Sequence, residues 1–175
     1  MANLKTATHG KGAMKGVNLV VISYDNGVHT NDKTKAVSRY LDARVSPQDE
    51  RAAGQTSLAL VTRKTDRGYS NSERYTSKED GTGQFEQIVE AAGDNVAPLT
   101  DKDGNVVGKI YGVKADVFPS KGGLVINTKT LEASDFSVGN DDKGRDIREQ
   151  IFDSQREAKA AREAAAPQAE APEAE

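Results

Sequence analysis

Apolar residues along the chain recur mainly with the two-residue period of β-strands, in short runs separated by turn-forming residues. The runs predict strands over residues 17–24, 28–30, 56–63, 69–78, 96–99, 105–118 and 124–128. Turn-forming residues between them predict hairpins at positions 26–27, 64–68, 101–104 and 119–123. Because the strands follow one another at intervals of roughly 8–12 residues, the pattern predicts a mainly β, OB-like barrel or sandwich.

Side chains alternate between apolar and polar in the longest predicted strand, 105–118. Its odd positions from 111 to 117 are apolar, and its even positions include Lys114, Asp116 and Phe118. We therefore expect one face of this strand in the core and the other in water. Glycines recur at every fourth position from 104 to 112. They fall inside the strand rather than between a strand and a helix, so they predict a bulged or bent strand and not a phosphate-binding loop.

Three further segments have patterns that fit helices. Segment 82–93 places apolar residues at positions i, i+3, i+4 and i+7 and ends in a glycine that can take a left-handed conformation, which predicts a helix. Segment 46–54 begins with a capping serine and a proline and ends in a glycine, which predicts a second, short helix. Segment 33–44 fits either a helix or a strand, and its pattern leaves the choice open.

The chain changes character near Gly139. Residues 1–139 hold 18 Lys+Arg and 17 Asp+Glu, whereas residues 140–175 hold 6 and 10, so the net charge of −3 comes from the tail. We expect a flexible basic arm over 1–15, a β-rich domain over 16–139, a charged helix over 140–166 and a disordered acidic tail over 167–175. Because the helix carries only a small apolar patch around Ile151, we expect it to be exposed or loosely docked.

Several classes of protein are disfavoured by what the sequence contains. The longest apolar run is far shorter than the roughly 20 residues of a membrane helix, so we expect no membrane partner. The chain has no cysteine, which fits a reducing cytoplasm. His9 and His29 lie in no nucleophile or metal-ligand pattern, and the run 101–112 lacks the glycine and glutamate that a calcium loop requires. We expect neither an enzyme nor a bound cofactor or metal.

Basic and aromatic side chains form the candidate binding chemistry. Single-stranded nucleic acid is held by cations along its backbone and by flat rings on which bases stack, worth roughly 1–3 kcal/mol per base. The predicted hairpins and strands supply both kinds of group, and the candidate nucleic-acid-binding residues are Arg63, Lys64, Arg67, Arg74, Lys78, Tyr111, Lys114, Phe118 and Lys121. The alternative is that the basic residues only keep a β-protein soluble and protect its sheet edges.

In its general plan the chain resembles the small single-stranded-DNA-binding proteins of bacteria and phages. The resemblance lies in the β-rich body, the basic hairpin at 63–68, the helix set between strands at 84–93 and the acidic C-terminus, and it includes no specific motif. It implies an OB-fold, single-stranded DNA as ligand in replication or recombination, and a cytoplasmic location in a bacterial or phage-infected cell. This chain departs from the family in having no tryptophan and no phenylalanine near its acidic end.

The tail and the C-terminal helix leave alternatives open. The acidic tail is expected to recruit replication or repair proteins, to compete with phosphates for a basic groove, or only to aid solubility. One rival function is a structural or assembly protein of a virion, with the sheets forming a homo-oligomer. Another is a partner-binding regulator that acts through the helix around residues 147–152. Truncation after Gly139 is expected to abolish the regulator's activity and to spare a DNA-binding body.

Overall fold

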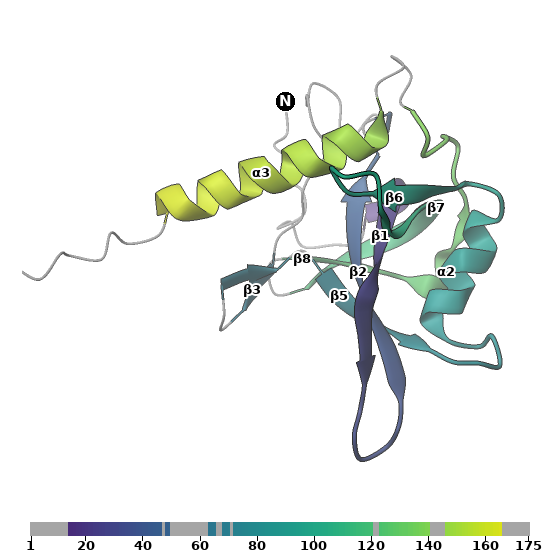
Figure 1. The fold of residues 1–175 in the computed structure, drawn as a ribbon. Helices are drawn as coiled ribbons and strands as arrows, with labels where there is room; N and C mark the ends of the chain where they lie inside the picture. Colours follow the sequence, from purple (N-terminus) through teal and green to yellow (C-terminus); the bar gives the residue numbers. More distant parts are fainter. Residues whose placement is uncertain are drawn as a thin grey trace, which may run out of the picture.

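The computed structural model describes residues 14–46, 48–49, 63–65, 68–70, 72–120, 123–140 and 146–165. The strands are β1 (Met14–Thr30), β2 (Val37–Val45), β3 (Arg63–Thr65), β4 (Gly68–Ser70), β5 (Ser72–Ser77), β6 (Val96–Thr100), β7 (Val106–Ser120), β8 (Gly123–Ile126) and β9 (Glu132–Ala133). The helices are α2 (Gln84–Ala92), α3 (Ile147–Ala165) and the short 3-10 helix η2 (Thr128–Thr130). Figure 1 shows their arrangement.

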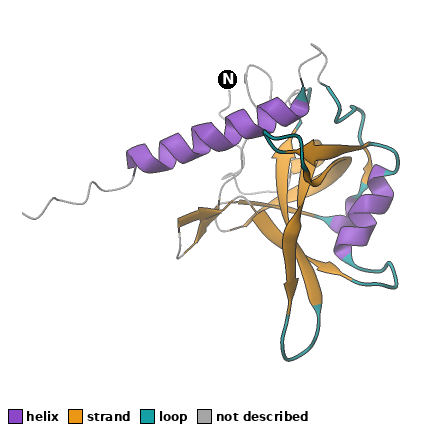
Figure 2. Cartoon of the chain, viewed as in Figure 1, coloured by secondary structure: helices purple, strands orange, loops and turns teal. Residues whose placement is uncertain are grey.

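One open antiparallel sheet organises the described part of the chain. Its strands follow the order β5-β2-β1-β7-β6, and β8 and β9 also pair with β7. Strands β3 and β4 form a separate two-stranded ribbon, as the predicted hairpin over 64–68 requires. Figure 2 shows the predominance of strands over helices. The predicted mainly β, α+β class is confirmed, and the sheet is consistent with an OB-like body.

The sheet buries side chains on both of its faces. Leu19 and Val21 of β1 pack in a cluster with α2, whereas Val20 and Ile22 pack in a second cluster with α3. A strand covered on both faces reads as a continuous apolar run rather than an alternating one. This explains the unbroken apolar stretch near the start of the chain.

The alternation expected for β7 is half right. Its odd positions 111–117 are buried in the cluster under α2, as predicted. The expectation that the even positions all face water is wrong, because Ile110 is fully buried in the second cluster. The reason is α3, a segment distant in sequence, whose docking covers that end of the other face.

The hairpin predicted at Asn26 and Gly27 is wrong. Strand β1 continues through these residues to Thr30, and its register against β2 shifts between Ser23 and Val28, which marks a β-bulge. The ladder persists beyond the bulge, so the chain reverses only at residues 31–36. The segment 33–44, which the sequence left undecided, therefore forms the end of this turn and most of β2. We call residues 28–39 the β1–β2 arm.

Other local predictions are confirmed. Helix α2 ends at Gly93, as predicted, and the positive φ of 55° at this residue favours glycine, although its ψ of −120° differs from that of the left-handed helical cap that the sequence predicted. Strands β6 and β7 are joined by a turn at 101–105, and Pro98 lies in β6 at the end of the sheet order, as an edge strand. The predicted helix over 46–54 and the strand over 56–63 lie almost entirely outside the described residues.

The C-terminal helix is docked more closely than its composition suggested. Ile147 and Ile151 of α3 are fully buried against the sheet. Arg148 anchors the same turns, since its Nη1 donates to Thr100 Oγ1 of β6 at 2.9 Å. The apolar side chains proposed to bind a partner are therefore already packed inside the protein. Beyond Phe152, the described side chains of the helix are exposed.

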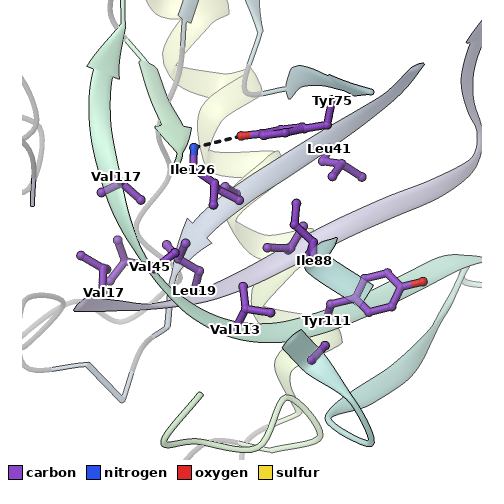
Figure 3. Packing of buried hydrophobic residues seen from close by; sticks show 14 residues of the cluster. Val17, Leu19, Leu41, Val45, Tyr75, Ile88, Tyr111, Val113, Val117 and Ile126 are labelled. Atoms are coloured by element: carbon purple, nitrogen blue, oxygen red, sulfur yellow. Dashed lines mark hydrogen bonds between the residues drawn. The ribbon is translucent and has the colours of Figure 1, made fainter. Parts of the chain in front are cut away.

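A buried hydroxyl joins the sheet's edge to β8. Tyr75 Oη accepts a hydrogen bond from the backbone N–H of Ile126 at 3.1 Å, inside the apolar cluster (Figure 3). Tyr75→Phe leaves that N–H without its acceptor, and we expect the free energy of unfolding to fall by about 1–3 kcal/mol. Urea unfolding followed by circular dichroism measures it. The matched control Tyr40→Phe, at an exposed ring, should change stability by less than about 0.5 kcal/mol. Equal effects of the two variants would contradict the prediction.

Candidate nucleic-acid interface

An exposed aromatic ring lies at the root of the β1–β2 arm. Tyr40 of β2 is 37% exposed, and the guanidinium carbon of Arg74 lies 5.3 Å from the centre of its ring. Arg74 Nη2 also donates a hydrogen bond to Tyr40 Oη at 3.0 Å. The exposed His29 ring of β1 meets the Tyr40 ring edge to face, with centroids 6.5 Å apart. We call Tyr40, Arg74 and His29 the arm platform.

Strand register places these side chains together. Tyr40 of β2 is directly opposite Arg74 of β5 in the antiparallel ladder. Their neighbours Leu41 and Tyr75 are buried in the cluster under α2, so alternation turns Tyr40 and Arg74 toward the other face. The bulge in β1 lies across from Tyr40, between the pairs that Leu41 and Arg39 make with β1.

One of the predicted binding residues, Arg74, lies at this surface, exposed in the middle of β5. Lys78 is also exposed, but it follows the end of the strand, about 13 Å further along the chain than Arg74, and its backbone N–H donates to Glu86 Oε2 of α2 at 3.2 Å. Arg74 gives the arm platform a local positive charge although the body of the protein is nearly neutral.

Lys114 does not belong to the same surface. Leu41, the neighbour of Tyr40, is level with Ser23 and Lys109, so Lys114 lies about 16 Å further along β7. Lys114 Nζ also donates to Asp135 Oδ2 at 3.1 Å, an interaction that holds the pKa of the Asp135 carboxyl below its usual range. The continuous basic track predicted from the sequence is therefore not formed between Arg74 and Lys114.

Tyr111 is a core residue, and the expectation that it stacks on bases is wrong. Its side chain is 5% exposed and packs edge to face on Phe85 of α2, with ring centroids 6.1 Å apart. Burial raises the pKa of the Tyr111 hydroxyl. The physical reason is the alternation of β7 itself, which directs its odd positions to the cluster under α2.

The remaining predicted residues are placed only in part. Arg63 and Lys64 belong to β3, and Phe118 belongs to β7 opposite Val125 of β8. The side chains of these three residues lie outside the description. Arg67 and Lys121 lie outside the described residues altogether.

Arg44 of β2 is a buried cation that cannot serve the interface. Its side chain is fully buried, and burial lowers its pKa despite the carboxylate of Asp42, whose Oδ2 lies 3.5 Å from Arg44 Nη2. Its Nε and Nη1 have no hydrogen-bond acceptor in the described part of the chain. Because the guanidinium is enclosed, a phosphate of a nucleic acid cannot reach it.

Metal ligation finds no support among the described residues. They contain no group of three or more His, Asp or Glu side chains placed to hold an ion. The carboxylate of Asp101 instead accepts hydrogen bonds from the backbone N–H groups of Asp103 and Asn105, both at 2.9 Å, and these bonds help to lower its pKa. This carboxylate therefore stabilises the turn between β6 and β7.

Sequence reasoning missed the aromatic part of the arm platform. Tyr40 was not a candidate because segment 33–44 was undecided between helix and strand, and His29 was taken as an ordinary surface residue. If Val37, Arg39 and Leu41 are assigned to one face of a strand, Tyr40 falls on the opposite face.

Two general findings complete the description. In the ranges that the structure describes, no helix has the length and apolar character needed to cross a membrane. Comparison of the chain with known family models, with curated proteins and with solved structures gives no match.

Proposed function

We propose that the protein binds single-stranded DNA without catalysing a reaction, through the arm platform. The observation that carries the proposal is the guanidinium of Arg74 lying over the exposed ring of Tyr40. Stacking surfaces next to cations are what sequence-tolerant single-strand binding requires. An arginine plane can itself stack on a base, so the pair offers two flat surfaces in one place.

The charge distribution supports a local site. The body of the protein is nearly neutral, so attraction to phosphates must come from a patch rather than from net charge. Arg74 supplies such a local positive charge beside Tyr40. Single-stranded DNA arises in replication and recombination, which we propose as the setting, with the acidic tail as a segment that recruits partners or competes with phosphates.

The test is binding of a labelled oligothymidylate, followed by fluorescence anisotropy over a series of salt concentrations. Log affinity should fall with log salt by about 0.7 per phosphate engaged. Tyr40→Ala should weaken binding by about 1–3 kcal/mol, which is roughly 5- to 150-fold, because a stacking surface is lost. Tyr40→Phe should retain most of the affinity.

Arg74→Ala should weaken binding and also make its salt dependence less steep, because it removes a cation next to the strand. The matched control is Lys102→Ala, which removes an exposed cation in the turn between β6 and β7. Failure of the wild-type protein to bind, or equal binding by Tyr40→Ala and wild type, would refute the proposed function.

A further inference from the structure

The end of β1 forms an edge of the sheet. Its pairing with β7 stops at Tyr24, opposite Gly108, whereas its pairing with β2 continues to Thr30. At this level β2 is enclosed, because its other side pairs with β5. Of the strands that the structure describes, none pairs with the β7 side of residues 25–30, where β1 runs past the other strands (Figure 1). An edge of this kind presents backbone groups to which a further strand can bind.

The alternation of backbone groups shows which atoms this edge presents. The N–H of Asn31 donates to the Ala36 carbonyl at 2.9 Å, so Asn31 directs its backbone groups toward β2. Because these directions alternate along an antiparallel strand, His29 also faces β2, while Val28 and Thr30 turn their N–H and C=O groups outward. Within the described ranges, no strand meets these outward groups.

Other edges of the sheet are protected against pairing. In β6, Pro98 has no N–H, and the N–H of Val96 donates to the carbonyl two residues before it at 2.9 Å. In β5, the N–H of Thr76 donates to the Gln84 side chain of α2 at 3.1 Å. The end of β1 has neither device, and its Val28 side chain is 43% exposed. An unprotected edge with an exposed β-branched side chain is typical of a surface that pairs with another strand.

A second copy of the chain fits this edge. If two copies align antiparallel about His29, Val28 of each copy lies opposite Thr30 of the other, and every outward N–H meets a C=O. Pairs of β-branched residues suit such cross-strand contacts. The same register brings Asp25 level with the exposed turn residue Lys33 of the second copy, so opposite charges flank the paired segment. The edge is therefore complementary to itself.

We propose that the protein forms a symmetric dimer through residues 28–30 of β1, which joins two sheets into one. The two-fold axis passes between the paired His29 residues, perpendicular to the sheet, so both arm platforms lie on the same face. From the spacing of strands and residues, the two Tyr40 side chains lie about 20 Å apart. The dimer offers a single strand of DNA two stacking sites. This last consequence rests on the proposed function, whereas the dimer itself does not.

Disulfide cross-linking tests the register of the dimer. The chain has no cysteine, so His29→Cys introduces a single thiol. In the proposed register the two residues at position 29 form a pair without backbone hydrogen bonds, with Cα atoms about 4.5 Å apart, which a disulfide can span. Oxidised glutathione should therefore convert His29→Cys to a covalent dimer roughly tenfold faster than the control Lys102→Cys, because the dimer holds the two thiols together. Equal rates would overturn the inference.

Sedimentation velocity measures association of the unmodified chain. An edge of three residues buries less than the roughly 1,200 Å² of a standard interface, so dimerisation should depend on protein concentration. Val28→Pro removes an outward N–H but no hydrogen bond to β2, so it should give a monomer with the circular dichroism of wild type. The matched control Val28→Thr keeps the N–H and the β-branched side chain and should still dimerise. A wild-type protein that stays monomeric up to about 1 mM, or dimerisation of Val28→Pro, would contradict the proposed edge.

Oligothymidylates of increasing length separate the dimer from the proposed function. The wild-type protein should gain affinity once the oligonucleotide is long enough to reach both arm platforms, and Val28→Pro should lack this step. A dimer that binds no single-stranded DNA would overturn the proposed function and leave the dimer intact. A monomer that binds single-stranded DNA would overturn the dimer and leave the proposed function intact.

Discussion

Gly108→Ala is expected to lower the free energy of unfolding by about 3 kcal/mol or more. Gly108 lies in β7 between Tyr24 of β1 and Leu99 of β6. A Cβ atom at this position would overlap the carbonyl oxygen of Ser23 and approach Tyr24 Cα to 3.0 Å. Both neighbours are backbone atoms of the central strand, so a side-chain rotation cannot relieve the overlap. The strands must separate, and their hydrogen bonds and packing weaken together.

The measurement is urea unfolding of the variant beside Gly139→Ala. At Gly139 a Cβ would meet only Ser137 Oγ, at an ordinary 3.7 Å, so this control keeps the same chemical change without the overlap. The control should lie within about 1 kcal/mol of wild type, because alanine also reduces the entropy of the unfolded chain. Similar stabilities for the two variants would show that β1 and β7 do not approach as closely at Gly108 as the structure indicates.

The glycine illustrates which features of the fold can be predicted from sequence. Recurrent glycines in 104–112 predicted a bulged or bent strand, but which of them contacts a neighbouring strand depends on pairing between segments far apart in the chain. Helix α2 was predicted correctly because its apolar spacing and its terminating Gly93 are local signals. Asn26 and Gly27 are an equally local signal, yet the β1–β2 ladder beyond them overrides their preference for a turn.

In the candidate site, too, local sequence signals could be predicted, whereas contacts between distant segments could not. Arg74 could be predicted because alternation within β5 directs it to solvent. Tyr40 could not, since its strand was ambiguous and its contact with Arg74 comes from pairing of β2 with β5. Lys114 was chosen from the alternation of β7, but its charge is paired with Asp135, from a loop that sequence alone does not bring near it.

Ile151→Ala is expected to lower the free energy of unfolding by about 2–5 kcal/mol. Ile151 is fully buried in the cluster that α3 forms with the sheet, where Val20, Ile22 and Ile110 line the other side. Alanine removes buried methyl and methylene groups and leaves a cavity, and the paired central strands cannot collapse to fill it. The substitution should also weaken the packing of α3 against the sheet, because Ile147 then lacks the second buried isoleucine that helps to hold the first turns of the helix.

The control for this variant is Ala160→Ser, an exposed position of the same helix. Serine at this exposed position lowers helix propensity by about 0.5 kcal/mol and changes no buried contact. If Ala160→Ser lowered the free energy of unfolding as much as Ile151→Ala does, the effect of Ile151→Ala would come from helix propensity and not from the packing of α3 on the sheet. Truncation after Gly139 removes both isoleucines and uncovers the apolar face, so it should destabilise the body more than Ile151→Ala does. Truncation after Ala165 retains the docked helix and should leave stability near wild type. Truncation after Ala165 therefore measures the contribution of the acidic tail to DNA binding without destabilising the domain, whereas truncation after Gly139 changes both.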